Sequence, residues 1–132
     1  MLIFRTPPSP QSYPNGDGCH HITLSSGEVD ENNDFGNYQQ AIKSGYKFED
    51  MDADGDISED TGNPLAGWTI EAYNASNTLV ATTTTDADGY YEFTLDPGDY
   101  TVCEVLQDGW TQSYPNGDGC HHITLSSGEV DE

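Results

Sequence analysis

The chain has 132 residues, enough for one domain of ordinary size, and its 3 Lys plus Arg against 24 Asp plus Glu give a formal net charge of −21. This charge excludes the class of proteins that bind nucleic acid through clustered Lys and Arg, and it argues against binding to an anionic membrane surface. The sequence contains no apolar run near the roughly 20 residues of a membrane-spanning helix.

An exact internal repeat begins after the first ten residues. Residues 11–31 read QSYPNGDGCHHITLSSGEVDE, and residues 112–132 repeat them without a change, at an offset of 101 residues. An identity of this length indicates parts of two units of a tandem array. Residues 1–10 have no counterpart, and we interpret them as an unexplained leader for which disorder is one expectation.

The repeat divides the remaining chain into two parts. Residues 11–43 are interpreted as a partial copy of the preceding repeat, made of its C-terminal hairpin and a closing strand at 34–38. Residues 44–132 are predicted to form a repeat that lacks its own closing strand. Because unpaired strand edges attract another chain, we expect copies of the chain to assemble head to tail by strand exchange. The alternative is a window on a longer covalent array.

Short strand patterns separated by turn residues fill residues 44–132. Strands are predicted at 45–49, 67–74, 78–85, 90–95, 99–106, 110–114 and 121–126. Alternation places apolar side chains on one face of these strands, as in a sheet with one wet face. The pattern predicts an all-β fold, an immunoglobulin-like Greek-key β-sandwich. The predicted core residues are Trp68, Ile70, Phe93, Tyr100, Val102 and Trp110.

An acidic loop follows the first of these strands. Asp50, Asp52 and Asp54 alternate, and Gly55 permits the sharp turn that wraps three carboxylates round one hard cation such as Ca²⁺. The twelfth position from Asp50 is Thr61 instead of a bidentate Glu, so we expect an EF-hand-like calcium loop between strands. A solvated acidic loop is the alternative, but so many like charges in one turn would repel one another without a counter-ion.

A second acidic turn places Asp86 and Asp88 before Gly89. Its Asp-Gly sequence is typical of a hairpin, and these carboxylates join the calcium shell only if the fold brings them near Asp50. The full set of predicted calcium ligands is Asp50, Asp52, Asp54, Asp56, Glu59, Asp60, Asp86 and Asp88.

The cysteines predict one disulfide bond and one unpaired thiol. Cys103 lies on a predicted strand, and Cys120 follows the turn that leads back alongside it, so an extracellular chain would join them. The position 101 residues before Cys103 is Leu2, which leaves Cys19 without a partner in its own copy. If the partial copy replaces the hairpin of another chain, Cys19 would bond Cys103 of that chain and link the two covalently.

The motifs GYKFED, DADGD, PLAGWTIEAYN and TTTTDADGYYEFTLDPGDYTVCEVLQDGW follow one another in the sequence. In this order they resemble the B-type repeat of Sdr surface adhesins, and they are similar to the wider Cna B-type, prealbumin-like domains of cell-surface proteins. DFGN at 34–37 resembles the closing strand of that family. The resemblance covers residues 44–132 and the partial copy, and it implies a calcium-stiffened sandwich strung in tandem as a stalk or adhesin. Where the family usually has Glu before a Gly-Leu-x-Gly element, this chain offers Glu59 or Asp60 as the nearest substitute.

Some Cna B-type relatives carry an internal Lys–Asn isopeptide bond assisted by Glu. The resemblance matches Glu104 to that Glu and implies Lys47 as the donor and Asn37 as the acceptor. Lys47 alternates with Tyr46 and Phe48, so it points away from the core if those two are buried, and an ordinary surface Lys is the favoured interpretation. An intact mass that lacks one ammonia would reveal the bond.

Together these features predict a secreted, extracellular structural module without enzymatic activity: a calcium-stabilised repeat of a surface protein or filament. The chain has no phosphate-binding, nucleophile-elbow or zinc-protease motif. The alternatives are an adhesin or carbohydrate-binding module that uses Tyr73, Tyr90 and Trp110, or an accessory domain of a larger secreted protein. Asn74 opens an N-glycosylation sequon.

Overall fold

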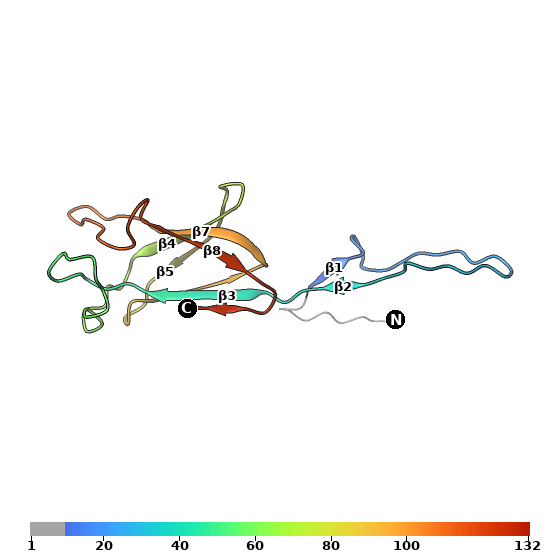
Figure 1. Ribbon diagram of the computed structural model, residues 1–132, viewed down its shortest axis with the longest axis horizontal. Helices are drawn as coiled ribbons and strands as arrows, with labels where there is room; N and C mark the ends of the chain where they lie inside the picture. Colours follow the sequence, from blue (N-terminus) through green and yellow to red (C-terminus); the bar gives the residue numbers. More distant parts are fainter. Residues whose placement is uncertain (1–9) are drawn as a thin grey trace.

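The computed structural model describes residues 10–132, and all regular elements in this range are β-strands (Figure 1). Strands β3 to β9 form a two-layer sandwich, which confirms the predicted fold class. β1 and β2 form a small separate sheet on a long extension that projects from one end of the sandwich. The leader assigned to residues 1–10 lies outside the described residues except for Pro10.

One layer of the sandwich has the strand order β6-β3-β9, and the other has the order β5-β4-β7-β8. The strands are β1 (Gln11–Tyr13), β2 (Gly36–Asn37), β3 (Ala41–Tyr46), β4 (Thr69–Asn74), β5 (Leu79–Thr84), β6 (Tyr90–Leu95), β7 (Gly98–Glu104), β8 (Cys120–Leu125) and β9 (Val130–Asp131). No helix in the described range is long and apolar enough to cross a membrane.

The register of β3 leaves part of one edge uncovered. β3 pairs with β6 along its whole length, antiparallel, from Ala41 opposite Leu95 to Tyr46 opposite Tyr90. On its other side, β9 runs parallel to β3 and pairs only at Ile42 and Lys43. Beyond Lys43 this side of β3 has no neighbouring strand among the described residues.

The core fills the space between the two layers. Its buried side chains are Ala41, Ile70, Ala72, Tyr91, Phe93, Leu95, Val102 and Leu125, with Ala81, Tyr100 and Ile123 packed against them. Trp68 is buried as predicted, whereas Trp110 keeps 38% of its surface exposed and packs edge-on against Trp68 at 5.5 Å. Leu125, which the sequence analysis did not select, is the largest side chain that is fully buried.

Five of the seven predicted strands occur close to their expected positions, from β4 to β8. The strand expected at 45–49 instead begins at Ala41, so residues 41–43, assigned above to the partial copy, belong to the sandwich. The start of this strand was wrongly predicted because a charged residue, Lys43, occupies an inward-facing position of β3 and is only 6% exposed, which interrupts the apolar alternation. The strand expected at 110–114 does not form, and β9 was not predicted.

The two identical copies have different environments. Leu125 is 2% exposed in the sandwich, while its counterpart Leu24 on the extension is 61% exposed. Ile123 packs against the core, while its counterpart Ile22 is 53% exposed. The extension therefore presents a sequence that is elsewhere part of a core, without the strands that would cover it.

Candidate functional site

The acidic loop is a long excursion whose two ends are held together. Phe48 pairs with Pro64 in an isolated bridge, and the Glu49 amide donates a hydrogen bond of 2.8 Å to the Asn63 carbonyl. These contacts close the base of the loop between β3 and β4. Residues 50–62 therefore form a closed loop whose carboxylate side chains can lie close together.

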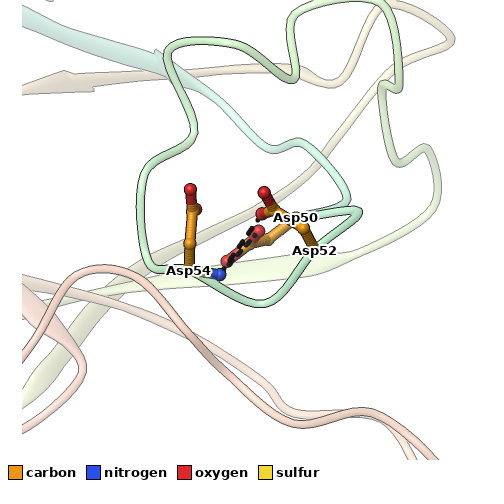
Figure 2. Close-up of side chains that lie close together, drawn as sticks. All are labelled: Asp50, Asp52 and Asp54. Carbon is orange, nitrogen blue, oxygen red and sulfur yellow. Dashed lines mark hydrogen bonds between the residues drawn. The ribbon is translucent and has the colours of Figure 1, made fainter.

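Three of the predicted ligands meet inside this loop. Asp50, Asp52 and Asp54 each offer a carboxylate oxygen, and the three oxygens lie within 4.8 Å of one another (Figure 2). The Asp54 amide donates to Oδ1 of both Asp50 and Asp52 at 3.3 Å, and the Gly55 amide donates to Asp50 Oδ2 at 2.9 Å. Gly55 and Ala53 have positive φ angles, which produce the tight curl. Such a set of oxygens suits a hard cation.

The crowding of like charges shifts the pKa values in the loop. The Ser113 hydroxyl and the Gly55 amide donate to Asp50 and lower the pKa of its carboxyl. The pKa of Asp52 is raised by desolvation and by the charge of Asp54. The pKa of Glu59 is raised to about 7, first by a hydrogen bond with Asp54 and then by the charges of Asp54 and Asp52. The raised pKa values of Asp52 and Glu59 thus reflect repulsion between neighbouring carboxylates, which a bound cation would relieve.

Asp60 adds a buried carboxylate to the same loop. It is 4% exposed, and its Oδ1 accepts a hydrogen bond of 3.4 Å from the Met51 amide. Its Oδ2 is buried and has no hydrogen-bond partner among the described residues. A buried carboxylate oxygen is costly unless a ligand or water satisfies it. This oxygen is an observation, independent of the exposed acidic cluster, that points to a ligand.

The other predicted ligands do not join the cluster. Asp56 accepts hydrogen bonds from the amide and hydroxyl of Ser58. Asp86 accepts hydrogen bonds from the Asp88 and Tyr90 amides, as the hairpin interpretation predicts. The structure therefore brings together Asp50, Asp52 and Asp54, and it leaves Asp86 and Asp88 in a separate turn.

Both lysines of the chain are enclosed within the sandwich. Lys43 Nζ lies 3.5 Å from Asp131 Oδ1, and Lys47 Nζ lies 2.6 Å from Glu104 Oε2. The Lys47 ammonium also lies 4.1 Å from the centre of the Trp68 ring. The surface of residues 10–132 consequently carries no Lys or Arg to balance its exposed acidic groups.

The expectation that Lys47 is an ordinary surface residue is wrong. Tyr46 is 56% exposed and is not part of the core, so the alternation along the chain turns Lys47 inward toward Glu104. Asn37, the third member of the isopeptide hypothesis, lies on β2 opposite Gln11. The structure thus assembles two of these three residues within one chain.

The predicted disulfide bond is confirmed. Cys103 and Cys120 are bonded across the β7–β8 pair, with their Cα atoms 4.6 Å apart. Cys19 is a free, exposed cysteine. Its bond to Cys103 of another chain remains a prediction.

The aromatic residues proposed for carbohydrate binding do not share one face. Tyr73 lies on β4 and donates to Glu71, while Tyr90 lies on β6 of the other layer and donates to Glu92. Trp110 packs against Trp68. At the glycosylation sequon, the Asn74 side chain accepts hydrogen bonds from the amides of residues 76 and 78 within its turn.

Comparison with known proteins identifies similar sequences and similar solved structures. The family model described as "SdrD B-like domain" matches residues 44–127. Serine-aspartate repeat-containing protein F of Staphylococcus epidermidis is 38% identical over 72 residues, which are 54% of this chain and 4% of that protein. Serine-aspartate repeat-containing protein D of Staphylococcus aureus (strain Newman) is 30% identical over 99 residues, 74% of this chain and 8% of that protein. The chain therefore spans less than a tenth of the length of these relatives.

The solved structure titled "The Bacillus anthracis TIE protein" has a similar fold. It matches with a TM-score of 0.52 at 20% identity, over 70% of this chain and 16% of that one. At this identity the likeness supports the sandwich fold alone.

Proposed function

This chain belongs to the SdrD B-like domain family, and on that premise we propose that it is a calcium-stabilised structural repeat of a cell-surface stalk or adhesin. In this proposal the module is a rigid spacer domain: it joins neighbouring domains in series and holds the distal domains away from the cell surface. We assign it a mechanical role, since the candidate site consists of carboxylates gathered in one loop.

The buried, unpartnered oxygen of Asp60 carries the calcium proposal. The loop already directs three carboxylate oxygens to within 4.8 Å of one another, and the same loop contains the buried carboxylate of Asp60. Ca²⁺ takes six to eight oxygen ligands, and carboxylates, backbone carbonyls and waters are its usual donors. Its two positive charges would also offset the repulsion that no exposed Lys or Arg relieves in the described residues.

The repeat itself supports head-to-tail assembly. The extension carries a second copy of the sequence that forms β8 and β9 in the sandwich, and it leaves Leu24 and Ile22 exposed. A heterologous contact of this kind generates an open chain of subunits. Light scattering in calcium tests it, because a chain that stays monomeric at high concentration contradicts assembly by strand exchange.

Thermal unfolding of the full chain in calcium and in chelator tests the metal site. With calcium at about a hundred times its dissociation constant, binding would stabilise the sandwich by about 2.7 kcal/mol, a shift of roughly 10–20 °C. Asp52→Asn should remove most of this shift. Asp88→Asn, an acidic substitution in the separate hairpin, should keep it. Equal unfolding temperatures in calcium and in chelator would contradict the calcium proposal.

A further inference from the structure

Each copy of the internal repeat contains a turn in which Gly follows Asn. The sequence holds two such Asn-Gly pairs, at 15–16 and at 116–117, and they are counterparts in the two copies. The first pair lies on the extension, and the second lies in the loop between β7 and β8, at the end of the sandwich away from the extension (Figure 1). All four residues are exposed and belong neither to the core nor to the acidic loop. The proposed function therefore gives these turns no role.

The two turns have the same local structure. Their glycines have φ angles of 78° at Gly16 and 81° at Gly117. In each copy a Gln side chain holds the end of the turn: Gln11 donates to the Gly18 carbonyl at 2.8 Å, and Gln112 donates to the matching carbonyl at 2.7 Å. A reaction that is confined to the turn should therefore proceed alike in both copies, although their tertiary surroundings differ.

The backbone nitrogen that follows each Asn is free of hydrogen bonds and open to solvent. The amides of Gly16 and Gly117 donate to no group within residues 10–132. A Cβ built on either glycine meets no atom within 4 Å, and without a side chain on the glycine the Asn side chain can fold back onto this nitrogen. Asn116 and Gly117 also border a hollow of about 260 Å³, through which water reaches them. These conditions favour attack of the nitrogen on the neighbouring side-chain amide.

Hydrogen bonding distinguishes these turns from two of the Asp-Gly turns, Asp54-Gly55 and Asp88-Gly89. The Gly55 amide donates to Asp50 Oδ2, and the Gly89 amide donates to a backbone carbonyl of its own hairpin, both at 2.9 Å. A nitrogen held in this way must give up its hydrogen bond before it can attack a side chain. An ionised carboxylate is also a poorer electrophile than a neutral amide. The structure thus protects the acidic loop and leaves the two Asn-Gly turns open to reaction.

We propose that Asn15 and Asn116 are sites of spontaneous deamidation. The glycine nitrogen forms a bond to the Asn Cγ atom and loses its proton, and the side-chain nitrogen leaves as ammonia, which produces a cyclic imide. Water then adds to either carbonyl of the imide and opens it to aspartate or isoaspartate, so water is the only co-reactant. Each conversion adds one negative charge to a described surface that has no Lys or Arg to balance it. This inference depends neither on calcium nor on assembly.

The test incubates the full chain at mildly alkaline pH, where water opens the imide as it forms, and follows the masses of tryptic peptides. Cleavage after Arg5, Lys43 and Lys47 places the two sites in different peptides, residues 6–43 and residues 48–132. We expect each peptide to gain about one dalton, at similar rates in the two copies and at least tenfold faster than at any other Asn. Fragmentation should locate the gain at Asn15 and Asn116, and reaction in heavy-oxygen water should label the same two residues.

The variants Asn15→Ser and Asn116→Ser are matched controls, because both positions are exposed in identical turns. Each should abolish the mass gain in its own peptide and leave the rate in the other peptide unchanged. Asp54 should take up no heavy oxygen in the folded chain. It should do so after unfolding in guanidinium chloride, where the Gly55 amide loses its hydrogen bond to Asp50.

Unchanged masses of both peptides would overturn the inference. A gain at Asn15 alone would overturn the assignment of Asn116 and would show that tertiary contacts hold its turn. Uptake of heavy oxygen at Asp54 in the folded chain would overturn the argument that the Gly55 hydrogen bond protects the acidic loop. Each of these results leaves the proposed function as it stands, since the unfolding and light-scattering measurements decide it separately.

Discussion

The repeat supplies a matched pair of substitutions, Leu125→Ala and Leu24→Ala, which change the same residue in the same 21-residue sequence. Leu125 is 2% exposed and is part of the core, whereas Leu24 is 61% exposed on the extension. Differences in local sequence therefore cannot explain different effects. Only the tertiary surroundings of the two side chains differ.

The expected cost at Leu125 follows from its burial. Leu→Ala removes three carbon groups, each worth about 0.8 kcal/mol when buried, or about 2.4 kcal/mol in transfer free energy. The cavity left behind raises the loss in the free energy of unfolding to about 3–4 kcal/mol. For a sandwich of this size the unfolding temperature should fall by roughly 12–30 °C. Leu24→Ala should change the free energy of unfolding by less than about 0.5 kcal/mol.

Urea unfolding followed by tryptophan fluorescence measures both variants, because Trp68 is 3% exposed in the folded sandwich. The protein should be dilute, so that association does not contribute to the measured stability. Equal losses at the two positions would refute the reasoning, since they would show that the extension packs as the sandwich does. A small loss at Leu125 would show that β8 is not a fixed part of the core.

Three further predictions use the same unfolding assay. Cys120→Ser should lower the free energy of unfolding by about 3 kcal/mol because it removes the disulfide bond that closes a 17-residue loop, while Cys19→Ser should leave it unchanged. A non-reducing gel of wild-type protein whose free thiols have been blocked tests the Cys19 link between chains, and monomer bands alone would exclude it. Burial and the charge of Lys43 lower the pKa of His121 from 6.5, so the folded state favours the neutral ring and the free energy of unfolding should fall as the pH drops below about 6.5. His121→Gln should make this fall with pH less steep, and a pH dependence equal to that of the wild type would contradict the assignment. Lys47→Met should lower the free energy of unfolding by about 3 kcal/mol because it leaves the buried Glu104 carboxylate without its ion-pair partner, and adding Glu104→Gln should recover part of this loss. The intact mass of the wild-type monomer should show no loss of ammonia, since Asn37 lies on the separate β1–β2 sheet.

The local features of the fold could be predicted from the sequence. Alternating apolar residues located β6 at its observed bounds, and the position of two cysteines about a turn predicted their bond. The spacing of Asp50, Asp52 and Asp54 likewise identified the three carboxylates that meet. These features depend on residues that are near one another in the chain, and short-range geometry restricts them strongly.

The candidate site was predicted only in part, because its other members depend on the packing of distant segments. The burial of Asp60 needs the closed base of the loop, and the separation of Asp86 from the cluster depends on where its hairpin lies. The direction of Lys47 was wrongly predicted because it depended on whether Tyr46 is buried. No spacing rule contains that information.

What the sequence determined by itself is the family, the sandwich, the disulfide and the acidic loop, since each is encoded by residue types at short spacings. The tertiary structure alone decided how two identical segments are used. Gln11–Tyr13 form a strand and residues 112–114 do not, while Leu24 is exposed and Leu125 is buried. Identical sequences have identical local preferences, so the difference comes from non-local contacts: strand pairing and burial require a partner, and the partner is present at only one of the two places in each case.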